Sequence, residues 1–247
     1  MTALRHAGAW TAALVRAARL ALPQRCALCV AAAGASLLCP ACAAGLPRVP
    51  AACPVCALPA DDGNRCGACL AHPPPWSRAL AAFVYAFPVD RLLIELKYGG
   101  RLALADWAGA ALAAAVEISL ARRMPAERPD RIVALPLAEA RQHERGFNQA
   151  REIATRVAAA AGLPLATALQ RTRGAVPQAG LAWRERARNV RGAFIAAGDV
   201  RGARIALVDD VLTTGATLAE ASRVLLRAGA ADVECWVVAR TLGPEGR

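Results

Sequence analysis

The chain has 247 residues, of which 56% are hydrophobic and 4% aromatic, and its formal net charge is +11. This length suits one large α/β domain with a small additional module, and the apolar share is ample for a buried core. No segment contains the roughly 20 uninterrupted apolar residues that a membrane span needs, so we expect no membrane span. The basic excess is concentrated in residues 141–191, where ten Arg stand against three Glu. Such a segment favours a polyanionic partner, either a phosphate ligand or a nucleic acid.

Residues 1–25 open the chain with basic and apolar side chains. Arg16 and Arg19 interrupt the apolar stretch and no small-residue cleavage site follows it, which argues against a signal peptide. Leu14 and Ala18 fall near one helical face. We therefore expect an amphipathic helix here, and a cytoplasmic protein.

Eight of the nine cysteines form four Cys-x-x-Cys pairs, and each of the first four recurs 27 residues later. Residues 26–70 therefore contain an internal duplication, which we interpret as a double zinc ribbon. Zn²⁺ takes four thiolates, so eight ligands fit two structural zinc ions. The ions could lie within each group of four or across the two groups, and the spacing leaves both pairings open. The candidate ligands are Cys26, Cys29, Cys39, Cys42, Cys53, Cys56, Cys66 and Cys69.

Residues 71–79 contain three consecutive prolines and are interpreted as a linker. After it, residues 80–247 are predicted to form an α/β domain. The segments that read as strands are 79–87, 131–137, 204–210 and 232–240, and those that read as helices are 89–100, 101–121, 147–162 and 215–230. The alternation of the two from residue 130 onward predicts a parallel sheet with flanking helices. In such sheets ligands bind beyond the carboxyl ends of the strands.

Two adjacent carboxylates, Asp209 and Asp210, stand at one of these strand ends, just before a turn rich in hydroxyl groups. The turn opens a helix, whose first amide groups have no internal partner and attract a phosphate. The carboxylates suit the vicinal hydroxyls of a sugar that bears this phosphate, so a ribose 5-phosphate fits the whole set. The residues assigned to the phosphate are Thr213, Thr214, Gly215, Ala216 and Thr217.

This turn resembles the phosphoribosyl-pyrophosphate signature of type I phosphoribosyltransferases. The ordered set of Cys-x-x-Cys pairs, "ELKYGGR", "ALPL" with "ERGFNQA", "PQAGLAWRERARNVRGAF" and the signature turn is similar to the ComF family of bacterial phosphoribosyltransferase-like proteins. The resemblance implies a type I phosphoribosyltransferase-like core with a hood, binding of phosphoribosyl pyrophosphate with Mg²⁺, and a link to DNA uptake in natural competence. On this resemblance Asp209 and Asp210 are the candidate catalytic residues.

The resemblance also assigns residues outside the turn. The loop 136–145 is expected to hold the pyrophosphate, and Lys97 is expected near the hood. The basic segment 171–194 is expected to act as a mobile flap or part of the hood. The pyrophosphate candidates are Leu137, Ala138, Arg141 and Arg145, and the flap candidates are Gln178, Arg186 and Asn189.

Three functions remain open from the sequence. The first is a phosphoribosyltransferase whose acceptor is not legible. The second is a non-catalytic protein that binds single-stranded DNA on its basic face, with Trp76, Tyr85, Tyr98, Phe147 and Trp183 as candidates for base stacking. The third is a phosphoribosyl-pyrophosphate sensor that moves a partner. Proteins of the DNA-uptake machinery are expected partners in each case.

Overall fold

The structure is a computed structural model that describes residues 24–49, 51–172 and 192–242. Residues 1–23 of the predicted N-terminal helix and the flap candidates Gln178, Arg186 and Asn189 lie outside the described residues, and residues 24–25, the end of that predicted helix, form a strand. The described chain divides into two compact units, residues 1–46 and 47–247. The predicted linker, residues 71–79, does not coincide with this division, which falls between Leu46 and Pro47.

The first unit contains one Cys-rich repeat. Its strands β1 (Gln24–Arg25) and β2 (Ala32–Gly34) pair antiparallel, and helix α2 (Pro40–Ala44) follows directly. Pro40 begins α2, where its missing amide costs no hydrogen bond. The elements are short because four cysteines, in place of a large apolar core, organise this segment.

The second Cys-rich repeat opens the second unit and reproduces the backbone of the first. Helix α3 (Gly67–Ala71) lies 27 residues after α2. Two non-glycine residues with positive φ, Val30 at 64° and Ala57 at 56°, also occupy equivalent positions. Each donates its amide to the carbonyl of the first cysteine of its repeat. The duplication predicted from the cysteines is therefore a duplication of conformation.

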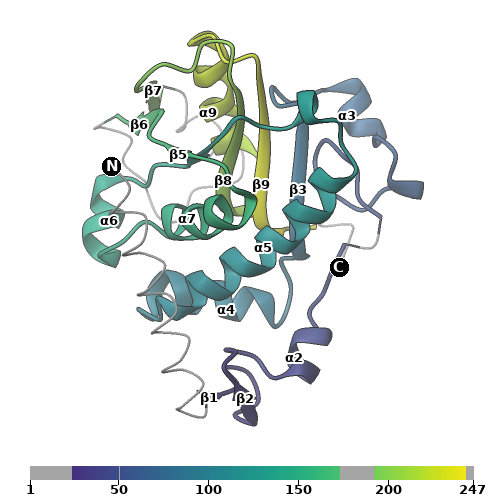
Figure 1. Cartoon of the computed structure of the whole chain (residues 1–247), viewed down its shortest axis with the longest axis vertical. Coiled ribbons are helices and arrows are strands. Elements are labelled where there is room, and N and C mark those ends of the chain that lie inside the picture. Colours follow the sequence, from purple (N-terminus) through teal and green to yellow (C-terminus); the bar gives the residue numbers. More distant parts are fainter. Residues whose placement is uncertain (1–23, 50, 173–191, 243–247) are drawn as a thin grey trace. The chain divides into compact units, whose positions relative to one another are not determined.

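A five-stranded sheet in the order β3-β9-β8-β4-β5 forms the centre of the second unit, and every neighbouring pair is parallel (Figure 1). The predicted parallel sheet is confirmed. Two short strands beside it, β6 and β7, form a separate antiparallel pair. The strand bounds are β3 (Arg78–Val84), β4 (Arg131–Ala134), β5 (Leu165–Ala166), β6 (Leu169–Arg171), β7 (Phe194–Ala196), β8 (Arg204–Leu212) and β9 (Asp232–Arg240).

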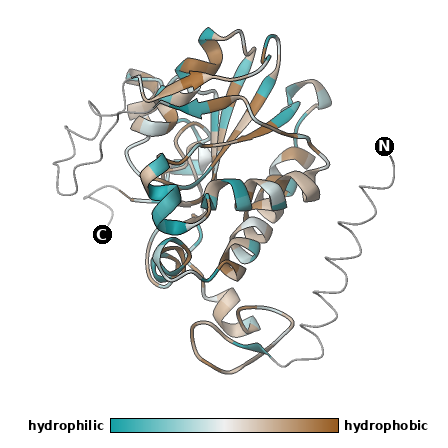
Figure 2. Ribbon diagram, turned by 90° about the vertical axis from the view of Figure 1, so that its left-hand side faces the viewer, coloured by the Kyte–Doolittle hydropathy of each residue, from teal (hydrophilic) through white to brown (hydrophobic). Residues whose placement is uncertain are grey.

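Helices cover both faces of the sheet, as a parallel sheet requires. Helices α5 (Ala103–Ala121) and α7 (Gln149–Ala161) pack on one another and on the sheet, and α4 (Val89–Tyr98) packs on α5. Helix α9 (Ala216–Arg227) packs on β7, β8 and β9. Figure 2 shows hydrophobic strand segments enclosed by helices that carry both hydrophobic and hydrophilic residues.

The helix α5 is long and apolar enough, by length and composition, to cross a membrane. In the fold it lies against α4, α7, β3 and β9, and its inward residues Leu104, Ala108, Leu112 and Val116 are buried. The inward apolar side chains of α5 are therefore part of the core of the second unit. No other described helix meets the same measure.

Four predicted strands and four predicted helices are present; β9 has the predicted bounds, and the other seven have shifted ends. The first strand begins at Arg78, inside the predicted linker, because the adjoining Ser77 already donates its amide to Val233 of β9. Residues 139–145 form a short helix, α6 (Glu139–Arg145), instead of an open loop. Two 3₁₀ turns complete the described elements, η1 (Asp61–Gly63) and η2 (Pro125–Glu127).

Candidate functional site

The two adjacent acids lie at the carboxyl end of β8, on the edge of the sheet where ligands bind in this architecture. Asp210 is buried, whereas Asp209 is partly accessible. Burial and the charge of Asp210 raise the pKa of Asp209 to about 8. The amide of Asp210 also donates to Oδ1 of Asp209 at 2.8 Å, which fixes the orientation of this carboxyl group.

The hydroxyl-rich turn follows β8 and ends on α9. Thr213 and Thr214 are exposed, and Thr214 Oγ1 accepts the amide of Ala216 at 3.2 Å. Gly215 is the N-cap residue of α9 with a φ of 80°, a left-handed conformation that favours glycine. The first turn of α9 contains no acidic side chain. The backbone N–H groups of Thr217 and Leu218, at the N-terminus of α9, can therefore bind an anion without competition from an acidic side chain of the first turn.

Lys97 joins the predicted hood motif to the acidic pair. The lysine lies near the end of α4, and its Nζ is 2.8 Å from Oδ2 of Asp210. Burial lowers the pKa of Lys97, but the charges of Asp210 and Asp209 outweigh burial, and the pKa is raised. The ammonium group of Lys97 is therefore charged.

The segment after β4 reaches the same region through Arg145. The guanidinium carbon of Arg145 lies 4.8 Å from the centre of the Tyr98 ring, next to Lys97 in the chain. Leu137 and Ala138 precede α6, and Ala138 is its N-cap residue. From Gln142 onward the amides bond within α6 or at its cap.

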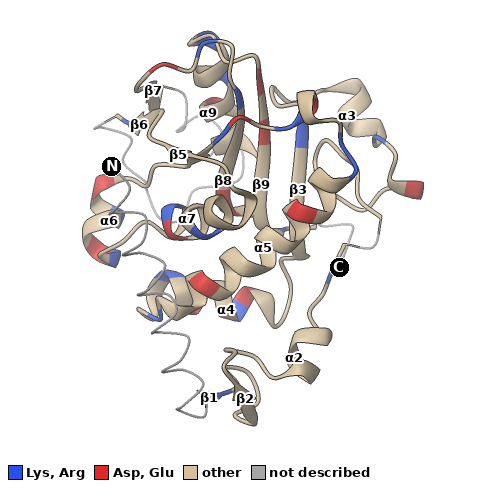
Figure 3. Cartoon of the chain, viewed as in Figure 1, with Lys and Arg blue, Asp and Glu red and all other residues tan. Residues whose placement is uncertain are grey.

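The arginine Arg171, at the end of β6, adds to the positive charge near the acidic pair. Burial and the charge of Arg141 lower its pKa, while the charge of Asp209 opposes this. Arg171 also lies over the Phe194 ring, with 5.3 Å between the guanidinium carbon and the ring centre. Figure 3 shows segments of acidic and of basic residues together on α4, α6 and α7. The edge that holds Asp209 thus combines both signs of charge.

Asn148 is a structural residue of this edge that the sequence reasoning missed. It caps α7, because its Oδ1 accepts the amides of Ala150 at 3.0 Å and Arg151 at 3.3 Å. Its Nδ2 donates to the carbonyl of Leu135 at 3.1 Å, just after β4. One side chain therefore ties the start of α7 to the end of β4. An Asn directly before a helical pattern is a recognised cap signal.

The cysteines form two clusters, each made of one repeat. Within each cluster the sulfur atoms lie within 4.8 Å of one another. Zinc is therefore expected within each repeat, and the pairing across repeats that the sequence left open does not occur. The clusters are Cys26, Cys29, Cys39 and Cys42, and Cys53, Cys56, Cys66 and Cys69.

The sulfur geometry suits tetrahedral zinc. The Sγ atoms of Cys29 and Cys39 are 3.6 Å apart, and those of Cys56 and Cys66 are 3.7 Å apart. Four sulfurs about 2.3 Å from one zinc ion would be spaced by about 3.8 Å. In both repeats the first cysteine receives backbone N–H bonds. Although burial opposes them, these bonds lower the pKa of Cys26 and of Cys53 to about 6, which favours the thiolates that bind zinc.

Comparison with known proteins agrees with both modules. A family described as "Double zinc ribbon domain" matches residues 17–70, and a family described as "Phosphoribosyl transferase domain" matches residues 144–247. The DNA utilization protein YhgH of Salmonella typhimurium is 39% identical over 210 residues, which cover 83% of this chain and 91% of that protein. Its namesake in Escherichia coli (strain K12) is 37% identical over 236 residues, which cover 90% and 100%. The chain belongs to the ComF family.

Two more distant matches extend the comparison. Competence protein F of Haemophilus influenzae is 29% identical over 184 residues, which cover 72% of this chain and 79% of that protein. Among solved structures, glutamine phosphoribosylpyrophosphate amidotransferase from B. subtilis matches with 22% identity and a TM-score of 0.39, covering 58% of this chain and 30% of that chain.

The predicted ComF-family site residues fall into two groups. The structure gathers Lys97, Arg145 and Asp210 at one edge of the sheet through the contacts with α4 described above. The flap candidates lie outside the described residues. The antiparallel pair β6–β7 brackets residues 172–193 and so joins the two ends of the segment predicted to be a flap.

One stacking candidate for nucleic acid is unsuitable. Trp76 is 6% exposed, and its indole N–H donates to the carbonyl of Val55 at 2.6 Å. A base cannot stack on a ring that is enclosed in this way. Tyr98, by contrast, is 66% exposed.

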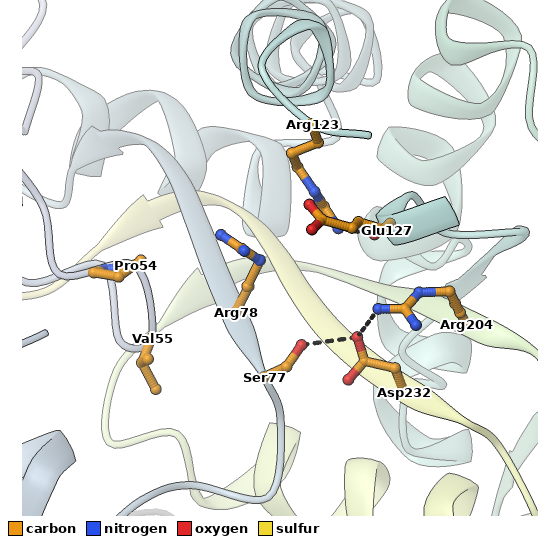
Figure 4. Close-up of a pocket in the computed structure, with 8 residues that line it drawn as sticks. All are labelled: Pro54, Val55, Ser77, Arg78, Arg123, Glu127, Arg204 and Asp232. Atoms are coloured by element: carbon orange, nitrogen blue, oxygen red, sulfur yellow. Dashed lines mark hydrogen bonds and ion pairs between the residues drawn. The ribbon is translucent and has the colours of Figure 1, made fainter. Parts of the chain in front are cut away.

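A cavity of about 370 Å³ lies at the other edge of the sheet, at the amino ends of its strands (Figure 4). Three of its charged residues, Arg123, Arg204 and Asp232, already have partners. Arg204 pairs with Asp232 at 3.0 Å, and Ser77 Oγ donates to the same carboxylate at 2.9 Å. We therefore assign the functional site to the edge that carries Asp209 and Asp210, and not to this cavity.

Proposed function

We propose that this chain is a phosphoribosyltransferase-type protein that binds phosphoribosyl pyrophosphate with Mg²⁺ at the carboxyl edge of its sheet. One observation carries the proposal. Asp209 and Asp210 stand within a few residues of a turn, 213–217, that opens the N-terminus of α9. Carboxylates accept hydrogen bonds from vicinal hydroxyls, and the turn offers amides and hydroxyls to a phosphate. A ribose 5-phosphate carries both groups on one small molecule.

The surrounding positive charge supports a second, larger anion at the same edge. Arg141 and Arg145 lie on α6, and Arg145 is held over Tyr98 beside Lys97. A pyrophosphate bound here would face several cationic side chains. Each arginine among them can donate two hydrogen bonds at once to phosphate oxygens. Leu137 and Ala138 would contribute backbone groups.

The chemistry of such a site is largely electrostatic. As pyrophosphate leaves the sugar, positive charge develops on the ring, and the electron-rich carboxyl oxygens of Asp209 and Asp210 would stabilise it. Mg²⁺ would neutralise the pyrophosphate when bound with it, and carboxylate oxygens are the ligands it prefers. The acceptor of the phosphoribosyl group is unidentified.

The biological setting follows from the names of the relatives. Proteins named for DNA utilization and for competence cover most of this chain. We therefore propose a cytoplasmic role in the use or uptake of DNA, with proteins of the DNA-uptake machinery as partners.

Calorimetric titration of phosphoribosyl pyrophosphate with Mg²⁺ into the zinc-loaded protein tests the proposal. We expect binding by the wild type and a loss of at least about tenfold in affinity, or about 1.4 kcal/mol, in the Asp209→Asn/Asp210→Asn variant. Asp199→Asn is the control, because Asp199 is 73% exposed and pairs only with Arg201 among the described side chains. It should bind as the wild type does.

Unchanged affinity in the double variant would contradict the assignment of the ribose. If the folded wild type does not bind at all, single-stranded DNA becomes the ligand to titrate, and its affinity should fall steeply with salt. Binding without release of pyrophosphate in the presence of candidate acceptors would favour a sensor.

A further inference from the structure

Arg240, the last residue of β9, bonds to both the second zinc repeat and the phosphate turn. Its Nε donates to the backbone carbonyl of Cys56 at 2.8 Å. Its Nη1 donates to the carbonyls of Leu212 at 2.8 Å and Thr213 at 2.5 Å. Arg240 is 8% exposed, so these bonds are sheltered from water. One planar guanidinium therefore fixes the position of a cysteine ligand relative to the start of the turn.

Trp76 links the same two places by a second route. Its indole N–H donates to the carbonyl of Val55, which lies between Cys53 and Cys56. The other end of the ring lies against the turn, because a Cβ added to Gly215 would be 2.9 Å from Cη2 of Trp76. The side chain thus fills the space between the Cys-x-x-Cys knuckle and the N-cap of α9.

We propose that zinc at the second cluster presets the turn 213–217 for its phosphate through Arg240 and Trp76. The inference rests on the proposed function of that turn. The carbonyls of Val55 and Cys56 belong to the knuckle, and their position depends on the metal that gathers the four sulfurs. Without zinc the two side chains lose fixed acceptors, and the turn loses its support. Arg240 and Trp76 are positioning residues, since they contact the backbone of the turn or its glycine.

The two repeats then have different roles. Trp76 donates a hydrogen bond to Val55 and Arg240 donates one to Cys56, and both acceptors belong to the second repeat. The first repeat belongs to the other compact unit. Equivalent cysteines of the two repeats, Cys29 and Cys56, therefore form a matched pair for a test.

The experiment compares Arg240→Met and Trp76→Phe with the wild type. We expect both variants to keep two zinc ions per chain, to bind phosphoribosyl pyrophosphate about tenfold more weakly in calorimetry, and to show faster amide exchange at residues 214–217. Arg204→Met is the control, because it removes an arginine from the opposite edge of the sheet. It should change neither the affinity nor the exchange of the turn.

The matched cysteine variants test the role of the metal. Cys29→Ser and Cys56→Ser should each lower the zinc content by one ion, but only Cys56→Ser should weaken binding and speed exchange at the turn. If Cys56→Ser does not fold, Arg240→Met and Trp76→Phe decide the question, since neither removes a zinc ligand. Equal effects of the two cysteine variants would overturn the inference.

Amide exchange separates this inference from the proposed function. If the wild type does not bind phosphoribosyl pyrophosphate, the proposed function fails, but faster exchange of residues 214–217 in Arg240→Met still supports the preset turn. Unchanged affinity and unchanged exchange in both Arg240→Met and Trp76→Phe overturn it.

Discussion

The ammonium group of Lys97 lies 2.8 Å from the carboxylate of Asp210, and the two side chains are 19% and 6% exposed. This ion pair joins the end of α4 to the carboxyl end of β8. It is a direct contact between the predicted hood motif and the acidic pair.

The sheltered pair should show a large coupling energy. Lys97→Met leaves the buried carboxylate of Asp210 without its cation and should lower the free energy of unfolding by about 3 kcal/mol. Asp210→Asn in the same chain should restore much of this loss, because no unpaired charge then remains. Denaturant unfolding of the two single variants and the double variant measures the coupling. The exposed pair of Arg201 and Asp199, 82% and 73% exposed, should couple by less than about 1 kcal/mol; equal coupling in the two cycles would contradict the prediction.

The raised pKa of Asp209 predicts a stability that falls as the pH rises. In the unfolded chain the group titrates near pH 3.9, whereas the folded pKa is about 8. Between these values the folded state holds a proton that the unfolded state has released, so the wild type loses stability relative to Asp209→Asn. The two pKa values differ by about four, so at pH 8 the variant should be more stable by on the order of 5 kcal/mol.

Unfolding free energies of the wild type and Asp209→Asn, measured between pH 5 and pH 8, test this prediction. Asp199 is the comparison, because the backbone N–H of Arg201 lowers its pKa. Its replacement by Asn should give a difference of the opposite slope, at lower pH. If the difference in unfolding free energy between the wild type and Asp209→Asn does not depend on pH, the pKa of Asp209 is not raised in the folded state.

Gly215 should resist substitution for two separate reasons. Alanine there must adopt a φ of 80°, and its Cβ would lie 2.9 Å from the Trp76 ring. Gly202 has a φ of 67° and nothing within 4 Å of a built Cβ, so Gly202→Ala measures the backbone strain alone. We expect Gly215→Ala to cost about 1 to 3 kcal/mol more than Gly202→Ala in thermal or denaturant unfolding. If Gly215→Ala and Gly202→Ala lose similar amounts of unfolding free energy, the Trp76 ring moves away from the new methyl group at no cost, and the prediction is wrong.

Asn148 should contribute both a helix cap and a tie to β4. Asn148→Ala removes both and should lower the free energy of unfolding by about 1 to 2 kcal/mol. Asn148→Asp keeps the acceptor for the amides of Ala150 and Arg151 but cannot donate to Leu135. Its stability should therefore lie between those of the wild type and Asn148→Ala. If the aspartate variant is as unstable as the alanine variant, the tie to Leu135 outweighs the cap.

Most of the longer helices and strands could be predicted from the sequence because the patterns that indicate them lie within a few consecutive residues. The alternation of strands and helices after residue 130 depends on side-chain periodicity, and the helix ended by Gly162 depends on a residue that tolerates positive φ. Short elements were missed, among them β5, β6 and β7, because two or three residues carry no period. The helix α6 was also missed, since "EARQHER" is polar apart from Ala140 and carries no apolar period.

The sequence by itself determined the duplicated cysteines, the acidic pair and the turn that follows it, because each is a spacing within a few residues or a repeat of fixed length. Only the tertiary structure decided that each cysteine repeat closes on itself, that Lys97 reaches Asp210, and that Arg240 connects a zinc knuckle to the phosphate turn. Arg240 and Cys56 are 184 residues apart. Contacts of this kind follow from how strands and helices pack, and no local pattern encodes which distant carbonyl a buried guanidinium will meet.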